Sequence, residues 1–234
     1  MECRIPQKIG VIVVAGGKGV RVGGDMPKQF RILGQAPILV HTINALAKGL
    51  QPSKLVVVLP EIHTEYWRNL ASRFDVAPHS ITVGGAERFD SVKAGLEALG
   101  EDIDIVAIHD GVRPLCSQEL LHRTLECATN YGSAIPTIAI SDSVRLIEEH
   151  DSKMIDRSLL RAVQTPQIFD SITIRRAYNQ KYSPLFTDDA SVVEALGERV
   201  RLCEGEKQNI KITTSEDLLY AQMILENDED GNRV

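Results

Sequence analysis

A glycine-rich, basic segment near the start of the chain carries the residues best suited to chemistry. It reads Ala15-Gly-Gly-Lys-Gly-Val-Arg21 and continues to Pro27-Lys-Gln29. Gly16, Gly17 and Gly19 remove side chains where the chain must turn, so backbone N–H groups can approach a phosphate or a base closely. Arg21 and Lys28 add positive charge beside those groups. The segment predicts a binding loop for an anionic ligand, the alternative being a surface turn with two solvated cations.

Neither of the two commonest glycine signatures fits this loop. A dinucleotide fingerprint of the form G-x-G-x-x-G would start at Gly17 and require glycine where Val22 stands. A Walker A loop needs Lys-Ser or Lys-Thr after its last glycine, whereas Gly24 is followed by Asp25. The loop therefore belongs to another class of anion-binding loop.

The elements that must position this loop alternate along the chain. Short runs rich in β-branched residues predict buried strands over 9–15, 55–60, 103–109 and 133–140, with helix-like segments between them. This alternation is typical of an α/β protein with a Rossmann-like, doubly wound and mostly parallel sheet. A length of 234 residues suffices for one such core. We predict a single domain over 1–234.

A second glycine pair, Gly84 and Gly85, also separates a short predicted strand from a helix. In an open parallel sheet, ligands bind outside the carboxyl ends of the strands, where such loops gather. We therefore expect this second loop to line one crevice with the loop over 16–28. Asp110, at the carboxyl end of the third predicted strand, is a further candidate for that crevice.

The spacing of apolar residues over 61–73 predicts a helix with Ile62, Tyr66 and Leu70 on its apolar face. Trp67 is expected to pack in the core.

The last predicted strand covers residues 209–213. Alternation there places Lys211 on the opposite face from its isoleucine neighbours, toward solvent or toward the crevice. Thr214 and Asp217 resemble a capping box for a closing helix.

Residues 141–164 interrupt the alternation. They read as two extended pieces around a polar turn at 149–153, which predicts a β-hairpin-like excursion from the domain. Its apolar residues, among them Leu146, Met154 and Leu159, need cover. A partner subunit is one way to supply it, and packing against the same domain is the other.

Composition excludes several classes of protein. A net charge of −6 and a pI near 5.6 argue against a general nucleic-acid or membrane-surface binder. No apolar run approaches a membrane span or a signal sequence, so we expect a cytoplasmic protein. The cysteines show no C-x-x-C spacing and the histidines no H-E-x-x-H cluster. We therefore expect reduced thiols and no zinc site built by the protein.

From residue 9 to about residue 225 the motifs resemble one known family, the cytidylyltransferases of the non-mevalonate isoprenoid pathway, or IspD family. The resemblance rests on the order and spacing of short motifs. They are Ala15-Gly-Gly-Lys-Gly-Val-Arg21, Pro27-Lys-Gln29, Gly84-Gly-Ala-Glu-Arg88 with Ser91, His109-Asp-Gly-Val-Arg-Pro114, Asp142-Ser143, Asp156-Arg157, Gln164-Thr-Pro-Gln167, Thr187-Asp-Asp-Ala-Ser191 and Asn209-Ile-Lys-Ile-Thr213.

The resemblance implies roles for the matching residues. Arg21 and Lys28 would be catalytic and stabilise the pentavalent phosphorus, and Arg157 and Lys211 would position the acceptor phosphate. The implied nucleotide-binding residues are Ala15, Gly16, Gly17, Gly19, Gly85, Ser91 and Asp110. The implied acceptor-binding residues are Asp110, Arg113, Ser143, Thr165 and Thr187. In the family, the arm over 141–164 reaches across a homodimer to help bind the acceptor.

The implied reaction transfers CMP from CTP to 2-C-methyl-D-erythritol 4-phosphate and releases pyrophosphate. A phosphate monoester is largely ionised near neutral pH, so its in-line attack needs no general base and no covalent enzyme intermediate. The resemblance also implies Mg²⁺, which we expect on the triphosphate and not on protein side chains.

Other functions stay open at this point. Gly16, Val20, the Gly111-Val112 pair and Ser143 depart from the residues usual in the family, and the sister D-ribitol-5-phosphate cytidylyltransferases share most of the nucleotide motifs. A GT-A-like glycosyltransferase usually has an Asp-x-Asp motif at a strand's carboxyl end, whereas Asp102-Ile-Asp104 lies at the other end. A catalytically silent nucleotide-binding protein would not need to retain Arg21, Lys28, Arg157 and Lys211 together.

Overall fold

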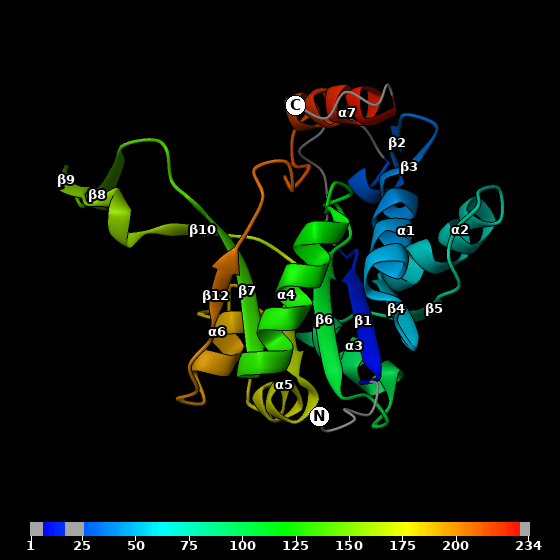
Figure 1. Cartoon of the computed structure of the whole chain (residues 1–234), viewed down its shortest axis with the longest axis horizontal. Coiled ribbons are helices and arrows are strands. Elements are labelled where there is room, and N and C mark those ends of the chain that lie inside the picture. Colours follow the sequence, from blue (N-terminus) through cyan, green and yellow to red (C-terminus); the bar gives the residue numbers. More distant parts are fainter. Residues whose placement is uncertain (1–6, 17–25, 230–234) are drawn as a thin grey trace, which may run out of the picture.

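A computed structural model describes residues 7–16 and 26–229 of the chain (Figure 1). The strands of its central sheet are β1 (Ile9–Val14), β4 (Lys54–Leu59), β5 (Ser80–Val83), β6 (Ile105–Asp110), β7 (Ser133–Ala139), β10 (Arg161–Val163), β11 (Gln167–Asp170) and β12 (Leu202–Glu204). Their order is β10-β7-β11-β6-β1-β4-β5, with β12 also paired to β7. β1 pairs in parallel with β4 and β6, and β4 pairs in parallel with β5. The predicted α/β class with a mostly parallel sheet is confirmed.

Helices cover both faces of this sheet. They are α1 (Ile38–Leu50), α2 (Glu61–Ala71), α3 (Arg88–Leu99), α4 (Gln118–Tyr131), α5 (Ser171–Tyr178) and α6 (Asp189–Glu194). A further helix, α7 (Ser215–Glu229), lies beyond one end of the sheet (Figure 1). Short 3-10 turns form η1 (Lys28–Phe30) and η2 (Arg157–Leu159). Two small pairs, β2 (Ile32–Leu33) with β3 (Ala36–Pro37) and β8 (Val144–Glu148) with β9 (Asp151–Ile155), lie outside the main sheet.

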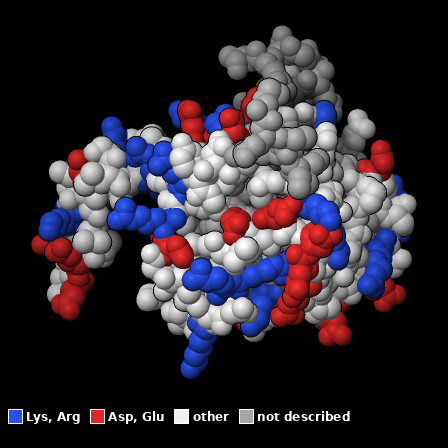
Figure 2. All heavy atoms as spheres, turned by 60° about the horizontal axis from the view of Figure 1, so that its bottom comes forward, with Lys and Arg blue, Asp and Glu red and all other residues white. Residues whose placement is uncertain are grey.

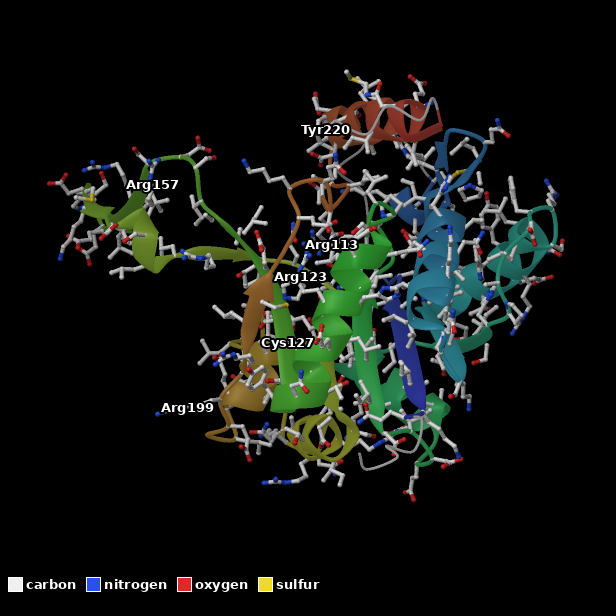
Figure 3. The ribbon with its side chains drawn as sticks, in the orientation of Figure 1. Arg113, Arg123, Cys127, Arg157, Arg199 and Tyr220 are labelled. Atoms are coloured by element: carbon white, nitrogen blue, oxygen red, sulfur yellow. The ribbon has the colours of Figure 1, made fainter. Side chains whose placement is uncertain are left out.

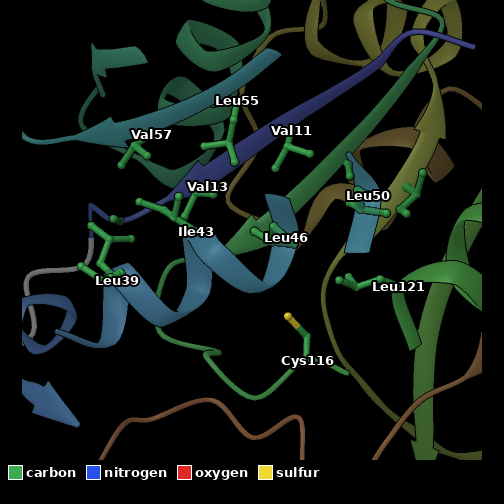
Figure 4. Close-up of a cluster of buried hydrophobic side chains, with 14 of the residues drawn as sticks. Val11, Val13, Leu39, Ile43, Leu46, Leu50, Leu55, Val57, Cys116 and Leu121 are labelled. Atoms are coloured by element: carbon green, nitrogen blue, oxygen red, sulfur yellow. The ribbon is translucent and has the colours of Figure 1, made fainter. Parts of the chain in front are cut away.

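Alternate residues of the central strands face two separate cores. Val11 and Val13 of β1 pack with α1 and α4 on one face, and this cluster is seen in Figure 4. Ile12, between them, packs with α3 and α5 on the other face. Because both faces are covered, these strands read as continuous apolar runs without alternation. This is why the strands at 9–15, 55–60, 103–109 and 133–140 could be predicted to within one or two residues at most ends.

β11 breaks the parallel pattern. It lies antiparallel between β6 and β7, and it brings the chain back after the excursion over 141–164. The sequence reasoning recognised the return to the domain at this point but did not assign a strand there. The sheet is therefore mixed: β5, β4, β1 and β6 are parallel, and β12 is parallel to β7.

The apolar face predicted for the helix over 61–73 is wrong at Ile62 and Tyr66. In α2, Ile62 is 82% exposed and Tyr66 is 41% exposed, whereas Trp67 and Ala71 are buried and Leu70 is half-buried against the core. The Trp67 indole stacks near Phe30, and its Nε1–H donates to His79 Nε2 at 3.0 Å. Burying the large indole with a hydrogen-bond partner outweighs burying the smaller apolar side chains, so the helix is rotated. The expectation that Trp67 packs in the core is confirmed.

The strand predicted over 209–213 is also wrong, because this segment has no regular secondary structure. Its backbone groups bond instead to scattered partners: the Ile212 N–H donates to the Val112 carbonyl, and the Asn209 carbonyl accepts from Arg113 Nη1. The predicted capping box that follows is confirmed. The Thr214 N–H donates to Asp217 Oδ2 at 2.8 Å, and the Asp217 N–H donates to Thr214 Oγ1 at 3.1 Å.

Residues 141–160 form an arm that extends away from the sheet (Figure 1), so the predicted excursion over 141–164 ends earlier, because 161–163 form β10 and pair with β7. β8 and β9 pair antiparallel, which confirms the predicted hairpin. The turn is shorter than predicted and covers only Glu149 and His150, because Asp151 already belongs to β9. The arm bears charged side chains of both signs (Figure 2). Its apolar side chains are also exposed, Ile147 at 77% and Leu159 at 80%.

Candidate active site

The loops after the parallel strands leave from one edge of the sheet. Backbone hydrogen bonds continue past the strand ends: the Ala15 N–H donates to the Val58 carbonyl at 2.9 Å, and the Gly111 N–H donates to the Val14 carbonyl at 2.9 Å. The residues after β1 and β6 are therefore held side by side. The carboxyl ends of these strands form the crevice in which ligands of open α/β sheets bind.

Several residues with an implied nucleotide-binding role meet at this edge. A Cβ atom on Gly84 would lie 2.6 Å from Ser91 Oγ, and one on Gly16 would lie 3.8 Å from the same atom. Ser91 is buried, and its hydroxyl donates to the Glu87 carbonyl. The loop after β5 thus closes on the start of the loop after β1, next to Ala15. Gly17, Gly19 and Arg21 lie outside the described residues.

Lys28 reaches the same edge from η1. The neighbouring Gln29 is 2% exposed, and its Nε2 donates to the Ala15 carbonyl at 2.7 Å, which ties η1 to the end of β1. Lys28 Nζ donates to the Thr213 carbonyl. Thr213 belongs to the same irregular segment as Lys211, so this bond brings the two lysines implied at different phosphates to one part of the molecule.

Asp110 is the centre of a cluster of positive charges. Its Oδ2 lies 2.9 Å from Lys211 Nζ and 3.5 Å from Arg113 Nε, and its Oδ1 lies 3.9 Å from Arg88 Nε. Burial alone would raise the pKa of Asp110, but Arg88, Lys211 and Arg113 outweigh it. The pKa of this carboxyl is therefore well below its ordinary value, and Asp110 is ionised at neutral pH.

A buried chain of hydrogen bonds lies behind Asp110. The Asp110 N–H donates to Thr165 Oγ1 at 3.1 Å, and Thr165 Oγ1 lies 3.1 Å from His109 Nδ1. His109 Nε2 lies 3.0 Å from the Arg113 carbonyl, which can only accept, so this nitrogen carries the proton. Nδ1 then accepts from the Thr165 hydroxyl.

Burial lowers the pKa of His109 to about 4, so the imidazole is neutral at pH 7 and has the tautomer that this chain of hydrogen bonds needs.

Arg88 links two acidic residues that are far apart in the chain. Its guanidinium donates two hydrogen bonds to Asp189, at 2.8 and 2.7 Å, and Asp189 is fully buried. The Tyr178 hydroxyl donates to the same carboxylate at 2.6 Å. Burial alone would lower the pKa of Arg88, but the Asp189 carboxylate outweighs it and the pKa lies above its ordinary value. Arg88 is therefore a fixed positive charge beside Asp110.

Sequence reasoning assigned Arg88 no role, although it quoted the residue as the end of the second glycine motif. The available signal was the Thr187-Asp-Asp189 motif, which supplies a carboxylate for it. Gln167 was overlooked in the same way: its Oε1 accepts from the Ala190 N–H and its Nε2 donates to Asp188, which fixes the start of α6.

The structure does not bring all the implied site residues together. Arg157 and Ser143 lie on the arm, and Figure 3 shows Arg157 far from Arg113. Arg157 Nη1 donates to the Ser141 carbonyl. Thr187 is exposed and precedes α6, where its N–H donates to Ser191 Oγ. Within one chain, the clustered residues are thus those of the domain body.

The described part of the chain contains neither a cluster of metal-binding side chains nor a membrane-spanning helix. Across residues 7–16 and 26–229, no group of three or more His, Cys, Asp or Glu side chains is arranged to hold a metal ion. Within the same ranges, no helix has both the length and the apolar character that a membrane span requires.

Comparison with known proteins agrees with this geometry. Residues 9–227 match the family model "IspD: 2-C-methyl-D-erythritol 4-phosphate cytidylyltransferase". The 2-C-methyl-D-erythritol 4-phosphate cytidylyltransferase of Bacteroides fragilis is 45% identical over 216 residues, which are 92% of this chain and 98% of that protein.

Solved structures show the same similarity. The 4-diphosphocytidyl-2C-methyl-D-erythritol synthase of Anaerococcus prevotii superposes with a TM-score of 0.80 at 26% identity, covering 94% of this chain and 99% of that one. The 2-C-methyl-D-erythritol 4-phosphate cytidylyltransferase of Thermus thermophilus gives a TM-score of 0.74 at 29% identity, covering 94% and 100%. The chain belongs to the IspD family, the 2-C-methyl-D-erythritol 4-phosphate cytidylyltransferases.

Proposed function

We propose that this chain transfers CMP from CTP to 2-C-methyl-D-erythritol 4-phosphate, giving 4-diphosphocytidyl-2-C-methyl-D-erythritol and pyrophosphate. The observation that carries the proposal is the set of cationic side chains at the carboxyl edge of the sheet. Lys28 donates a hydrogen bond to the irregular segment that carries Lys211. Lys211, Arg88 and Arg113 surround Asp110. A reaction between two anionic substrates needs such fixed positive charge.

The chemistry asks little else of the protein. The acceptor phosphate has a second pKa of about 6, so its oxygen is already a nucleophile at neutral pH. The obstacles are repulsion between the two anions and the charge that builds on the α-phosphoryl oxygens and on the leaving pyrophosphate. Preorganised cations reduce the repulsion between the anions and stabilise the charge that develops. The transfer then depends on aligning the attacking oxygen with the departing pyrophosphate.

The residues divide this work between the two substrates. Lys28, together with Arg21, stabilises the charge at the α-phosphorus of CTP. Gly16, Gly85 and Ser91 hold the nucleotide at the edge of the sheet, largely through backbone groups. Lys211 binds the acceptor phosphate, and its ion pair with Asp110 at 2.9 Å directs the ammonium group toward the same edge.

Arg113 and Thr165 bind the acceptor beside Asp110. Arg113 is almost fully buried, and its Nη1 is held by the Asn209 carbonyl at 2.7 Å. Its guanidinium is therefore preorganised, and little side-chain entropy is lost when substrate binds.

Mg²⁺ would be bound by the triphosphate of CTP, where it would neutralise phosphate charge. Asp110 is a poor ligand for it in this arrangement, because the carboxylate already contacts Lys211, Arg113 and Arg88.

The arm completes the acceptor site of a second copy of the chain. Arg157 and Ser143 lie on the arm, and Arg157 is far from Arg113, the partner of Asp110, in its own chain (Figure 3). An arm with exposed apolar side chains, such as Ile147 of β8 and Leu159 of η2, is stabilised when another surface covers it. A symmetric homodimer in which each arm reaches the partner's site satisfies both needs.

Pyrophosphate release with CTP and Mg²⁺ tests the function, with 2-C-methyl-D-erythritol 4-phosphate and D-ribitol 5-phosphate as rival acceptors. We expect turnover with the former alone. Turnover with ribitol phosphate alone would keep the nucleotide chemistry but assign the chain to the sister reaction. Absence of turnover with both would refute a cytidylyltransferase.

A further inference from the structure

Lys211 lies between two buried residues of an irregular segment. Asn209 is fully buried and Ile212 is 2% exposed, whereas the Lys211 side chain is 47% exposed. The Ile212 N–H donates to the Val112 carbonyl at 2.9 Å, which fixes the segment after Lys211. Before Lys211 there is no strand pairing to do this, since 205–209 lie beyond the end of β12.

Gln164 takes the place of the missing strand. Its Nε2 donates to the Glu206 carbonyl at 2.7 Å, and its Oε1 accepts from the Glu206 N–H at 3.0 Å. The same Nε2 lies 3.3 Å from the Asn209 carbonyl. Gln164 is 4% exposed, so these bonds are shielded from water. One side-chain amide thus satisfies both backbone groups of Glu206, as a neighbouring strand would.

Asn209 ties the segment to the residues around Asp110. Its Nδ2 donates to the Thr165 carbonyl at 2.8 Å, and its own carbonyl accepts from Arg113 Nη1 at 2.7 Å. Thr165 also accepts the N–H of Asp110. The two partners of the ion pair, Lys211 and Asp110, are therefore positioned through one set of buried bonds.

Gly205 leaves the space that the Gln164 amide occupies. A Cβ atom at this position would lie 2.4 Å from Gln164 Oε1 and 3.0 Å from the Thr137 carbonyl. Because the shortest contact is with the end of a flexible side chain, alanine at 205 would displace the amide, whereas the backbone at Thr137 would have to move by only a few tenths of an ångström.

We infer that Gln164 is a positioning residue for the acceptor phosphate, which acts by fixing the segment that carries Lys211. The inference rests on the proposed function, in which Lys211 binds that phosphate. Gln164 also follows directly on β10, the sheet strand with which the chain returns from the arm, so the residue that holds the lysine segment lies next to that return.

Substitution of Gln164 by methionine tests this with the amide removed and the length of the side chain kept. Misplacement of a binding group by about 1 Å typically costs as much as roughly 100-fold in rate. We expect Gln164→Met to lower kcat/KM for 2-C-methyl-D-erythritol 4-phosphate by roughly 10- to 100-fold, through a raised acceptor KM. The KM for CTP should stay as in the wild type.

Gln180→Met is the matched control. Gln180 also donates two hydrogen bonds through Nε2, to the Ala177 and Val192 carbonyls at 2.9 Å each, but it joins α5 to α6. It should leave both KM values unchanged. If the two variants raise the acceptor KM equally, the effect is general loosening of the domain and the inference is overturned.

A second comparison separates positioning from mere stability. In a Lys211→Ala background, Gln164→Met should have no further effect on the acceptor KM, because the group it positions is gone. If the effects of the two substitutions on the acceptor KM multiply in the double variant, the inference is overturned. Gly205→Ala should reproduce the Gln164→Met kinetics, and it carries the test if that variant does not fold.

Failure of the proposed function would look different. If the wild-type chain turns over no acceptor with CTP, the function is refuted and the inference falls with it. An active wild type with an unchanged acceptor KM in Gln164→Met and Gly205→Ala overturns the inference alone.

Discussion

Asp110 Oδ2 and Lys211 Nζ lie 2.9 Å apart, although one residue ends β6 and the other lies in an irregular segment. The carboxylate is 12% exposed and the lysine side chain 47%. The ammonium group therefore stays accessible to a substrate phosphate while its direction is set by a nearly buried partner. Arg88 and Arg113 approach the same carboxylate, so Asp110 organises the positive charge of the whole site.

Asp110→Asn should destabilise the protein as well as impair catalysis. The substitution leaves Arg113 without the charge that compensates its burial, whereas Arg88 keeps Asp189; breaking a buried pair in this way typically costs roughly 3 to 5 kcal/mol. Urea unfolding at pH 7 measures the loss. Asp102→Asn is the control, because the Asp102 side chain is 86% exposed and its ion pair with Lys8 lies at the surface. Equal stability of the two variants would contradict the central role of Asp110.

His109 should make stability depend on pH between about 4 and 6.5. The unfolded chain takes up a proton near the ordinary pKa of about 6.5, whereas the buried imidazole does so only near pH 4. The unfolded state therefore binds more protons in this window, and stability falls as the pH falls. With about 1.4 kcal/mol per pKa unit, the contribution lost between pH 7 and pH 5 is about 2 kcal/mol.

His109→Gln tests this, since glutamine can donate and accept hydrogen bonds but does not titrate here. The free energy of unfolding, measured by urea at pH 7 and pH 5, should drop by about 2 kcal/mol less in the variant than in the wild type. Parallel pH profiles for the two proteins would show that His109 already binds its proton in the ordinary range.

The parts of the fold that could be predicted are those with a local cause. Val56, Val57 and Val58 are all fully buried, alternately on the two faces of the sheet, and an uninterrupted β-branched run indicates such a strand. The face of α2 could not be predicted in the same way. Ile62 and Trp67 lie on different faces of the helix, and the spacing of apolar residues does not show which face is buried. The tertiary partners Phe30 and His79 decide this in favour of Trp67.

The site was predictable to a similar extent. Asp110 could be placed at the crevice because it ends a recognisable strand. Nothing near Arg88 in sequence indicates that its guanidinium binds Asp189, which lies 101 positions away. The segment around Lys211 was mistaken for a strand because alternating isoleucines suggest one, whereas the bonds that hold it come from Gln164, Arg113 and Val112.

Arg175 should be a stabilising residue without a role in catalysis. Its Nη1 donates to the Leu96 carbonyl at 2.9 Å, and its Nη2 donates to the Gly100 carbonyl, so it satisfies groups left open at the end of α3. Arg175→Met leaves these carbonyls without a charged donor and should cost about 1 to 3 kcal/mol of unfolding free energy.

Arg176→Met is the natural comparison, because that neighbouring side chain is 60% exposed and makes only a surface ion pair with Glu198 at 3.6 Å. It should leave the urea midpoint almost unchanged. Both variants should retain the wild-type kcat. A lower kcat in Arg175→Met at full folding would argue that the end of α3 influences the nucleotide loop.

Lys28→Ala should impair the chemical step. Removal of one preorganised charge from a transition state typically lowers kcat by roughly 100- to 1000-fold. The bond between Gln29 and Ala15 keeps η1 in place without the lysine, so the fold should persist. Steady-state pyrophosphate release gives kcat, and circular dichroism checks folding. A kcat near that of the wild type would remove Lys28 from the catalytic residues.

Hybrid dimers test whether Arg157 serves the partner's site. A Lys28→Ala chain keeps its arm, and an Arg157→Ala chain keeps its catalytic lysine, so a mixed dimer contains one site with both residues and one with neither. If chains exchange at random in an equal mixture, half the dimers are mixed and about a quarter of the wild-type activity should return. The assay uses acceptor below its KM, because Arg157→Ala is expected to weaken acceptor binding. Homodimers of each variant alone give the baseline. Activity equal to the mean of the two baselines, under conditions where exchange is shown by a tagged chain, would mean that each arm serves its own domain.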